Sequence, residues 1–155
     1  MLPQEKLENI ITSLWSFTES RYTLTSKYLW GYSGLNTQNL SEWVQFSYQN
    51  STRVFHRQSD QNYPGNTVHL DFMANIYVKQ TENFMRSVTI RDTLVGIFRR
   101  CIIPILDWTG DKARLGEIIG QDIIMDRPVA GEDDLSRHIL IFDMQYMEQF
   151  DRAHS

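Results

Sequence analysis

A run of alternating apolar and polar residues between Val68 and Lys79 constrains the fold more than any other stretch of this chain. Side chains along a β-strand point alternately to the two faces of a sheet, so this period of two predicts a strand with one buried face. The core-facing row is predicted to be Val68, Leu70, Phe72, Ala74, Ile76 and Val78. The outward row is predicted to be His69, Asp71, Met73, Asn75, Tyr77 and Lys79.

Three further segments have strand patterns. Trp43 to about Arg57 begins with the same alternation, and the polar stretch from Gln58 to Thr67 contains a turn signal, so the two strands are predicted to form a long hairpin. Leu115 to Arg127 is predicted to be a third strand, and His138 to Phe150 is predicted to be the last. The last strand has an inward row of Leu140, Phe142, Met144, Tyr146 and Phe150, and an outward row of Arg137, Ile139, Ile141, Asp143, Gln145 and Met147.

Two segments have the three- and four-residue apolar spacing of helices. Residues 3 to about 28 form the first, and Ser87 to Arg100 form the second, which ends before Pro104. The order helix, strand, strand, helix, strand, strand predicts an α+β fold. We expect an antiparallel sheet of about four strands with a long hairpin, and two main helices packed on one face. No linker or internal repeat divides the chain, which predicts a single domain over residues 1–155.

Composition narrows the class of protein. The formal net charge of −4 disfavours nonspecific attraction to nucleic-acid phosphates. The first residues have neither the charge nor the apolar run of a secretory signal, and no stretch is apolar enough to span a bilayer. A single cysteine, Cys101, fits a reducing compartment, so we expect folding in a cytosol. Aromatic residues make up 12% of the chain, which suits either an aromatic core or a protein–protein interface.

No chemical motif emerges from the residues that could carry one. His56 and His69 flank the predicted hairpin, but a zinc site needs three or four ligands, and no third is suggested by the spacing. Cys101 falls on the apolar side of the second helix, where a thiol is usually inert. The Gly31–Gly34 pair follows no predicted strand, and the acidic stretch 132–134 lacks the spacing of a calcium loop. The sequence therefore predicts no catalytic residue, cofactor or metal, and a protein that is not an enzyme.

The outward rows of the strands point instead to assembly. They mix polar and apolar side chains, as surfaces that meet another subunit often do. Long strands with uncovered edges also tend to aggregate unless another chain or element pairs with them. A homo-oligomer would cover both the outward surfaces and the strand edges, and we therefore expect the protein to form a homo-oligomer.

The order of elements resembles the tail-terminator, or tail-completion, proteins of tailed bacteriophages. The segments that carry the resemblance are Leu7 to Leu14, Trp43 to Arg57, Val68 to Lys79, Ser87 to Arg100 and Leu135 to Phe150. They cover most of the chain in order. The stretch between residues 15 and 40 departs from the pattern because it is longer than in the family.

The resemblance implies a structural virion protein that forms a ring, commonly a hexamer, on the completed tail tube. Such a ring ends tube polymerisation and joins the tail to the neck, at the head-proximal end of the tail, after assembly in the host cytoplasm. Its partners would be further copies of itself, the tail tube protein and a neck or head-completion protein. DNA would pass through an acidic lumen without specific binding. No membrane partner is implied.

The resemblance also suggests where contacts lie. The candidates for contacts between subunits are His69, Asp71, Met73, Asn75, Tyr77, Arg99, Arg100, Asp143 and Gln145. The candidates for axial contacts are Asn62, Tyr63 and Asn66 in the hairpin loop, and Glu132, Asp133 and Asp134 in the acidic turn. Three alternatives remain open: another ring of the same machine (neck, connector or tube), a small cytosolic hydrolase using His69, Asp71 and Asp143, and a monomeric adaptor.

Overall fold

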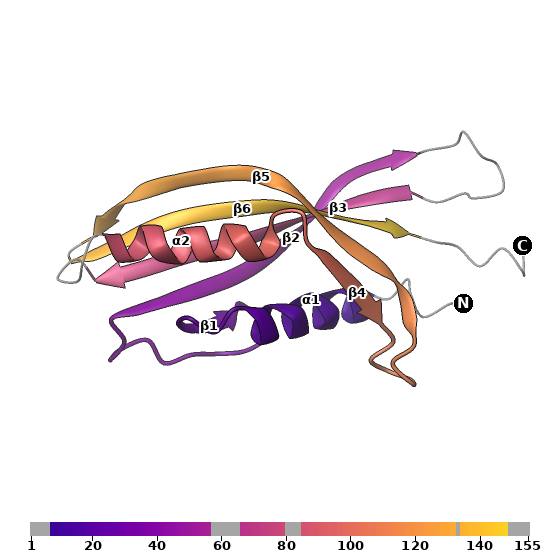
Figure 1. The fold of residues 1–155 in the computed structure, drawn as a ribbon, viewed down its shortest axis with the longest axis horizontal. Helices are drawn as coiled ribbons and strands as arrows, with labels where there is room; N and C mark the ends of the chain where they lie inside the picture. The colour runs from indigo at the N-terminus through magenta and orange to yellow at the C-terminus, as the bar shows by residue number, and fades with distance from the viewer. Residues whose placement is uncertain (1–6, 57–65, 80–84, 133, 149–155) are drawn as a thin grey trace, which may run out of the picture.

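The protein is a curled, twisted sheet with two helices along one side (Figure 1). The structure, a computed structural model, describes residues 7–56, 66–79, 85–132 and 134–148. Its elements in chain order are α1 (Leu7–Arg21), β1 (Ser26–Leu29), β2 (Glu42–His56), β3 (Asn66–Lys79), α2 (Met85–Phe98), β4 (Ile102–Leu106), β5 (Arg114–Glu132) and β6 (Leu135–Glu148).

The sheet has six strands in the order β1-β2-β3-β6-β5-β4. β1 is parallel to β2, and every other neighbouring pair is antiparallel. The strands curl into a half-barrel around the two helices (Figure 1). The predicted antiparallel sheet of about four strands is therefore wrong, because the sheet is mixed and has six strands.

The two strands that the sequence did not predict are the edge strands β1 and β4. β1 lies inside the segment predicted as the end of the first helix, which actually ends at Arg21. The Ser and Thr residues that follow favour turns and extended backbone over helix. β4 contains Pro104, which the sequence pattern marked as a helix terminator; an edge strand accepts proline because it needs hydrogen bonds on one side only.

The central pattern of the sequence is confirmed. All six residues of the predicted core-facing row of β3 are buried, and all but Val68 belong to the core that includes the buried residues of the two helices. In β6 the predicted inward row is buried at Leu140, Phe142 and Met144, whereas Tyr146 is only partly buried and Phe150 lies outside the described residues. Phe98 at the end of α2 stands in the middle of this core, with its ring centroid 5.3 Å from Phe72 and 5.5 Å from Phe142.

The first helix is joined to the β4–β5 end of the sheet by polar contacts. The Asn9 side-chain oxygen accepts a hydrogen bond from the backbone N–H of Trp108 at 2.9 Å. The Ser13 hydroxyl oxygen accepts two, from the backbone of Leu106 and from the Trp108 indole, at 3.0 and 2.9 Å. Because Asn9 and Ser13 are buried, these bonds fix the position of α1 on β4.

Candidate interaction face

The side of the sheet turned away from the two helices, named the outer face below, brings together most of the residues predicted to make contacts between subunits. The pairing of β3 with β6 sets His69 opposite Gln145, Asp71 opposite Asp143 and Tyr77 opposite Arg137. The sequence predicted these two outward rows separately. The structure shows that they are neighbouring rows of one surface.

A histidine–carboxylate contact lies near one end of this face. His69 Nδ1 is 2.9 Å from Asp143 Oδ1, and the Gln145 amide donates a hydrogen bond to Asp143 Oδ2 at 3.2 Å. His69 is only 9% exposed although it belongs to the row predicted to point outward. Side chains of the outer face thus cover one another, and the contact ties β3 to β6.

The carboxylate of Asp71 differs from its neighbour across the strands. Asp71 Oδ1 is buried and has no hydrogen-bond partner within the described part of the chain. Asp143, directly opposite, has both His69 and Gln145. A buried oxygen without a donor is unfavourable, and two like charges at opposed positions add repulsion. Asp71 is therefore an acceptor that the isolated subunit leaves unsatisfied among the residues described.

The other end of the face is held by an arginine. Arg137 donates hydrogen bonds from Nε and Nη2 to the Asn75 side-chain oxygen, at 3.0 and 2.7 Å. Its guanidinium also lies 5.8 Å from the centroid of the Tyr77 ring, which stacks on Trp43 at 5.2 Å. Asn75 is buried. These contacts make this end of the outer face a layer of interlocked side chains.

A groove of about 360 Å³ runs between these two ends. Its lining is Trp30, Gln45, Ser47, Tyr48, Gln49, Asp71, Met73, Asn75 and Ile141. Sequence reasoning missed Trp30, which follows β1 and whose backbone N–H donates to the Phe46 carbonyl oxygen. Once β1 is known, the alternation of side chains along a strand places Trp30 on the outer face, because Leu29 before it is buried on the opposite face. Trp30 is 66% exposed.

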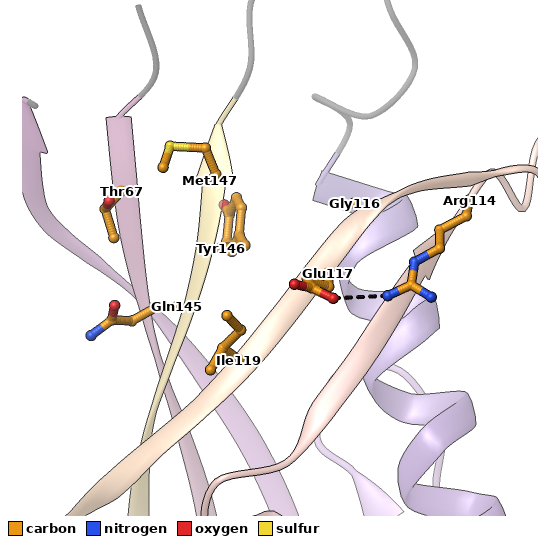
Figure 2. Close-up of a pocket in the computed structure, with 8 residues that line it drawn as sticks. All are labelled: Thr67, Arg114, Gly116, Glu117, Ile119, Gln145, Tyr146 and Met147. Atoms are coloured by element: carbon orange, nitrogen blue, oxygen red, sulfur yellow. Dashed lines mark hydrogen bonds and ion pairs between the residues drawn. The ribbon is translucent and has the colours of Figure 1, made fainter. Parts of the chain in front are cut away.

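A second groove, of about 380 Å³, opens where β5 leaves β6 (Figure 2). The two strands are paired up to Ile118 and Tyr146, and the groove lies at this end of their pairing. Figure 2 shows Gln145 and Met147 of β6 on one side and Glu117 of β5 on the other, with Arg114 bonded to Glu117 at 2.8 Å. The remaining lining residues are Thr67, Gly116, Ile119 and Tyr146.

Two long strands carry open edges in the described ranges. β1 pairs with β2 only up to Phe46, so from Ser47 to His56 β2 has no second neighbour among the described strands. β4 pairs with β5 up to Ile119, and the carbonyl of Gln121 still accepts a hydrogen bond from Arg100. From Asp122 to Glu132, β5 has no second neighbouring strand in the part of the chain that the structure describes. Such edges are templates for pairing with another chain.

The remaining predicted contact residues are more scattered. α2 ends at Phe98, so Arg99 and Arg100 follow the helix instead of forming its last turn. Arg99 pairs with Asp122 of β5 at 3.1 Å, and Arg100 is exposed. Asn66 begins β3, Glu132 ends β5 and Asp134 is exposed in the connection that follows. Asn62, Tyr63 and Asp133 lie outside the described residues.

An ion-pair network joins α2 to β5 and β6. Arg91 donates hydrogen bonds to Asp126 Oδ2, with Nε at 3.0 Å, and His138 Nε2 lies 2.6 Å from Asp126 Oδ1. Chiefly through the hydrogen bonds from Arg91, the pKa of the Asp126 carboxyl is lowered from its ordinary value of 3.8. This ion-pair network connects the helix to the sheet, on the side away from the outer face.

Metal and thiol chemistry find little support in the described residues. No group of three or more His, Cys, Asp or Glu side chains in this part of the chain is placed to hold a metal ion. Burial raises the pKa of the half-buried Cys101 thiol, which disfavours the reactive thiolate. Across the ranges that the structure covers, no helix has both the length and the apolar character needed to cross a membrane.

Comparisons with known proteins identify the fold alone. Ten solved chains match this one, and the first, titled with a sequence identifier only, superposes with a TM-score of 0.60 over 94% of this chain and 97% of its own. The two sequences are 8% identical, so the likeness extends to the fold and no further. No family model matches the chain, and no curated protein matches it.

Proposed function

We propose that this protein is a ring-forming structural subunit of a bacteriophage tail, and that the ring is the tail terminator. The observation that carries the proposal is the pair of open edges, one on β2 and one on β5, at opposite sides of the four central strands. A chain with two different edges can join copies head to tail, and a head-to-tail contact closes into a ring when the rotation permits.

The strand directions suit such a ring. β2, β3, β6 and β5 are successive antiparallel neighbours, so β2 and β5 run in opposite directions. A rotation about an axis parallel to the strands keeps each strand's direction. The β5 edge of one copy would therefore meet the β2 edge of the next as an antiparallel pair, the geometry with straight hydrogen bonds.

Exposed apolar residues lie near the same edges. Ile124 of β5 is 51% exposed, and Tyr48 of β2 is exposed beside Trp30. β4 also has an outer edge, but it is five residues long and contains Pro104, which lacks an N–H to donate. The longer edges of β2 and β5 are therefore the better places for a subunit contact.

The proposed role follows from a ring with two unlike faces. One face fits the last ring of the tail tube, the other meets a neck or head-completion protein, and tube growth stops. We propose six copies per ring, assembly in the host cytoplasm and a final place at the head-proximal end of the tail. The net charge of −4 per chain suits a lumen that repels DNA and lets it slide through.

Light scattering and negative-stain microscopy of the purified protein, alone and mixed with tail tubes, test the proposal. We expect discrete rings, free or on one end of the tubes. Open-ended tubes of the protein itself would identify a tube protein instead. A monomer that binds no tube end at any concentration would overturn the ring.

Two matched variants test the edge contact. Ile124→Lys places a charge on the free part of β5 and is expected to abolish rings, because a buried lysine at a strand junction is costly. Ile102→Lys makes the same change at a residue of β4 that is 58% exposed, and is expected to leave rings intact. Loss of rings in both variants, or in neither, would contradict a β5–β2 junction.

A further inference from the structure

We infer that the groove beside Trp30 receives the guanidinium of Arg127 from the neighbouring copy, and that this cation pairs with Asp71. The inference rests on the proposed ring and names the contact that would fix its register. Two observations support it: an unsatisfied acceptor, and a cation on the same face that has no partner among the described residues. One strand register between copies would bring the two together.

The acceptor is already in place in the single subunit. Asp71 Oδ1 is buried in the groove lining without a donor from the described residues, and Asp143 stands directly opposite. The other polar side chains of the lining are the amides of Gln45, Gln49 and Asn75 and the hydroxyls of Ser47 and Tyr48. Among the described residues, the groove therefore contains a carboxylate and no cationic side chain, which favours a positively charged occupant.

Trp30 adds a second feature that favours a cation. Its indole is largely exposed at the rim of the groove, beside the position where β2 loses its neighbour. An arginine side chain stacks well on an aromatic face, and tryptophan is the best such partner. A guanidinium entering past the β2 edge would meet this ring before it reached Asp71.

Arg127 has the properties that the occupant needs. It is exposed on the free part of β5, and the described residues show no hydrogen bond or ion pair to it. Its pairing partner on β6 is Ile139, which is itself opposite Asn75, so Arg127 belongs to the outer face. A ring built on the β5 and β2 edges would keep the outer faces of adjacent copies continuous.

One pairing register between β5 of one copy and β2 of the next brings Arg127 close to Asp71. If Arg127 of one copy stands opposite Gln49 of the next, antiparallel pairing sets residues 122–129 against residues 47–54, which are the free parts of both strands. Gln49 is opposite Asp71 in its own sheet. Arg127 and Asp71 would then lie two strand spacings apart, roughly 10 Å between backbones, and an extended arginine side chain crosses one intervening strand.

A double-mutant cycle on ring dissociation, measured in dilution series by mass photometry, tests the contact. Asp71→Asn and Arg127→Gln are each expected to weaken subunit association about 10-fold, and the double variant by no more than either one. Arg127→Lys should recover part of the loss. Arg114→Gln changes an arginine of the same strand within the β4-paired part and should leave association unchanged. Urea unfolding of each variant shows whether the subunit itself is intact.

The outcomes separate the contact from the ring. Rings that form normally in both single variants, or whose losses add in the double variant, would overturn the Arg127–Asp71 contact and leave the ring standing. A wild-type protein that forms no ring, alone or on tube ends, would overturn the proposed function and this contact with it.

Discussion

Asp71 of β3 stands directly opposite Asp143 of β6, so that two carboxylates occupy one pair position on the outer face. Only Asp143 is satisfied in the described structure, by His69 and Gln145. Like charges directly opposed across strands are destabilising, and a buried oxygen without a donor adds to the cost. An arrangement that costs the isolated subunit stability fits a surface used in assembly, where function and stability often conflict.

The free energy of unfolding of the isolated subunit should therefore rise when the charge of Asp71 is removed. Asp71→Asn keeps the shape, ends the repulsion and offers an N–H to Asp143, with an expected gain of about 1 kcal/mol by urea denaturation. Asp143→Asn is the matched control. It ends the same repulsion but weakens the bonds to His69 and Gln145, so no gain is expected. Equal gains in both variants would show that repulsion alone governs this pair.

The central strands could be predicted because their apolar and polar residues alternate with the period of two that a half-buried strand requires. The alternation from Val68 to Lys79 gave the correct buried row, since one face of β3 is buried along this whole stretch. β1 and β4 could not be found in this way. Each is short, and its pairing depends on where β2 and β5 place their edges, which is a property of the folded sheet.

The site was predictable in part, for a similar reason. Parity placed His69, Asp71 and Asp143 in outward rows, but no local pattern states that β3 and β6 are neighbours. The contact between His69 and Asp143, and the burial of His69, follow only from the strand order that places β3 beside β6. Trp30 was hidden because its role depends on β1, and a tryptophan after a predicted helix looks like part of a loop.

The Arg91–Asp126 ion pair should make the free energy of unfolding depend on pH in the acid range. The folded-state pKa of Asp126 is lowered, so the unfolded state binds the proton more readily. The stabilisation that ionised Asp126 contributes is therefore fully present above pH 3.8, and it is lost as the pH falls through the folded-state pKa. Asp126→Asn is expected to lower the free energy of unfolding by about 1 kcal/mol at pH 7, and the difference should shrink below pH 3.8.

Denaturant titrations of the wild type and the variant at several pH values measure this difference. Asp92→Asn is a suitable control because Asp92 contacts the same arginine from a largely exposed position. Its effect should be smaller at every pH. A difference between wild type and Asp126→Asn that persisted unchanged into strong acid would exclude the carboxylate as its source.

Ser13 should be more important for stability than its size suggests. Its buried hydroxyl oxygen accepts hydrogen bonds from Leu106 and from the Trp108 indole, and Ser13→Ala leaves both donors without that acceptor. We expect a loss of about 2 kcal/mol in urea unfolding. Ser20→Ala removes an exposed hydroxyl from the same helix and should change stability by less than about 0.5 kcal/mol. A similar loss in both variants would contradict the buried hydrogen bonds of Ser13 as the cause.

Gly120 of β5 and Gly96 of α2 should respond in opposite ways to the same added methyl group. A Cβ at Gly120 would lie 2.3 Å from the Phe98 carbonyl oxygen and 2.8 Å from the Cys101 sulfur, where α2 turns into β4. The backbone there would have to move, so Gly120→Ala is expected to cost about 2–3 kcal/mol.

A Cβ at Gly96 meets nothing within 4 Å, and alanine favours a helix more than glycine does. Gly96→Ala is expected to stabilise the protein by about 0.5–1 kcal/mol in the same thermal or urea unfolding experiment. Tolerance of Gly120→Ala would contradict the close approach of β5 to the end of α2.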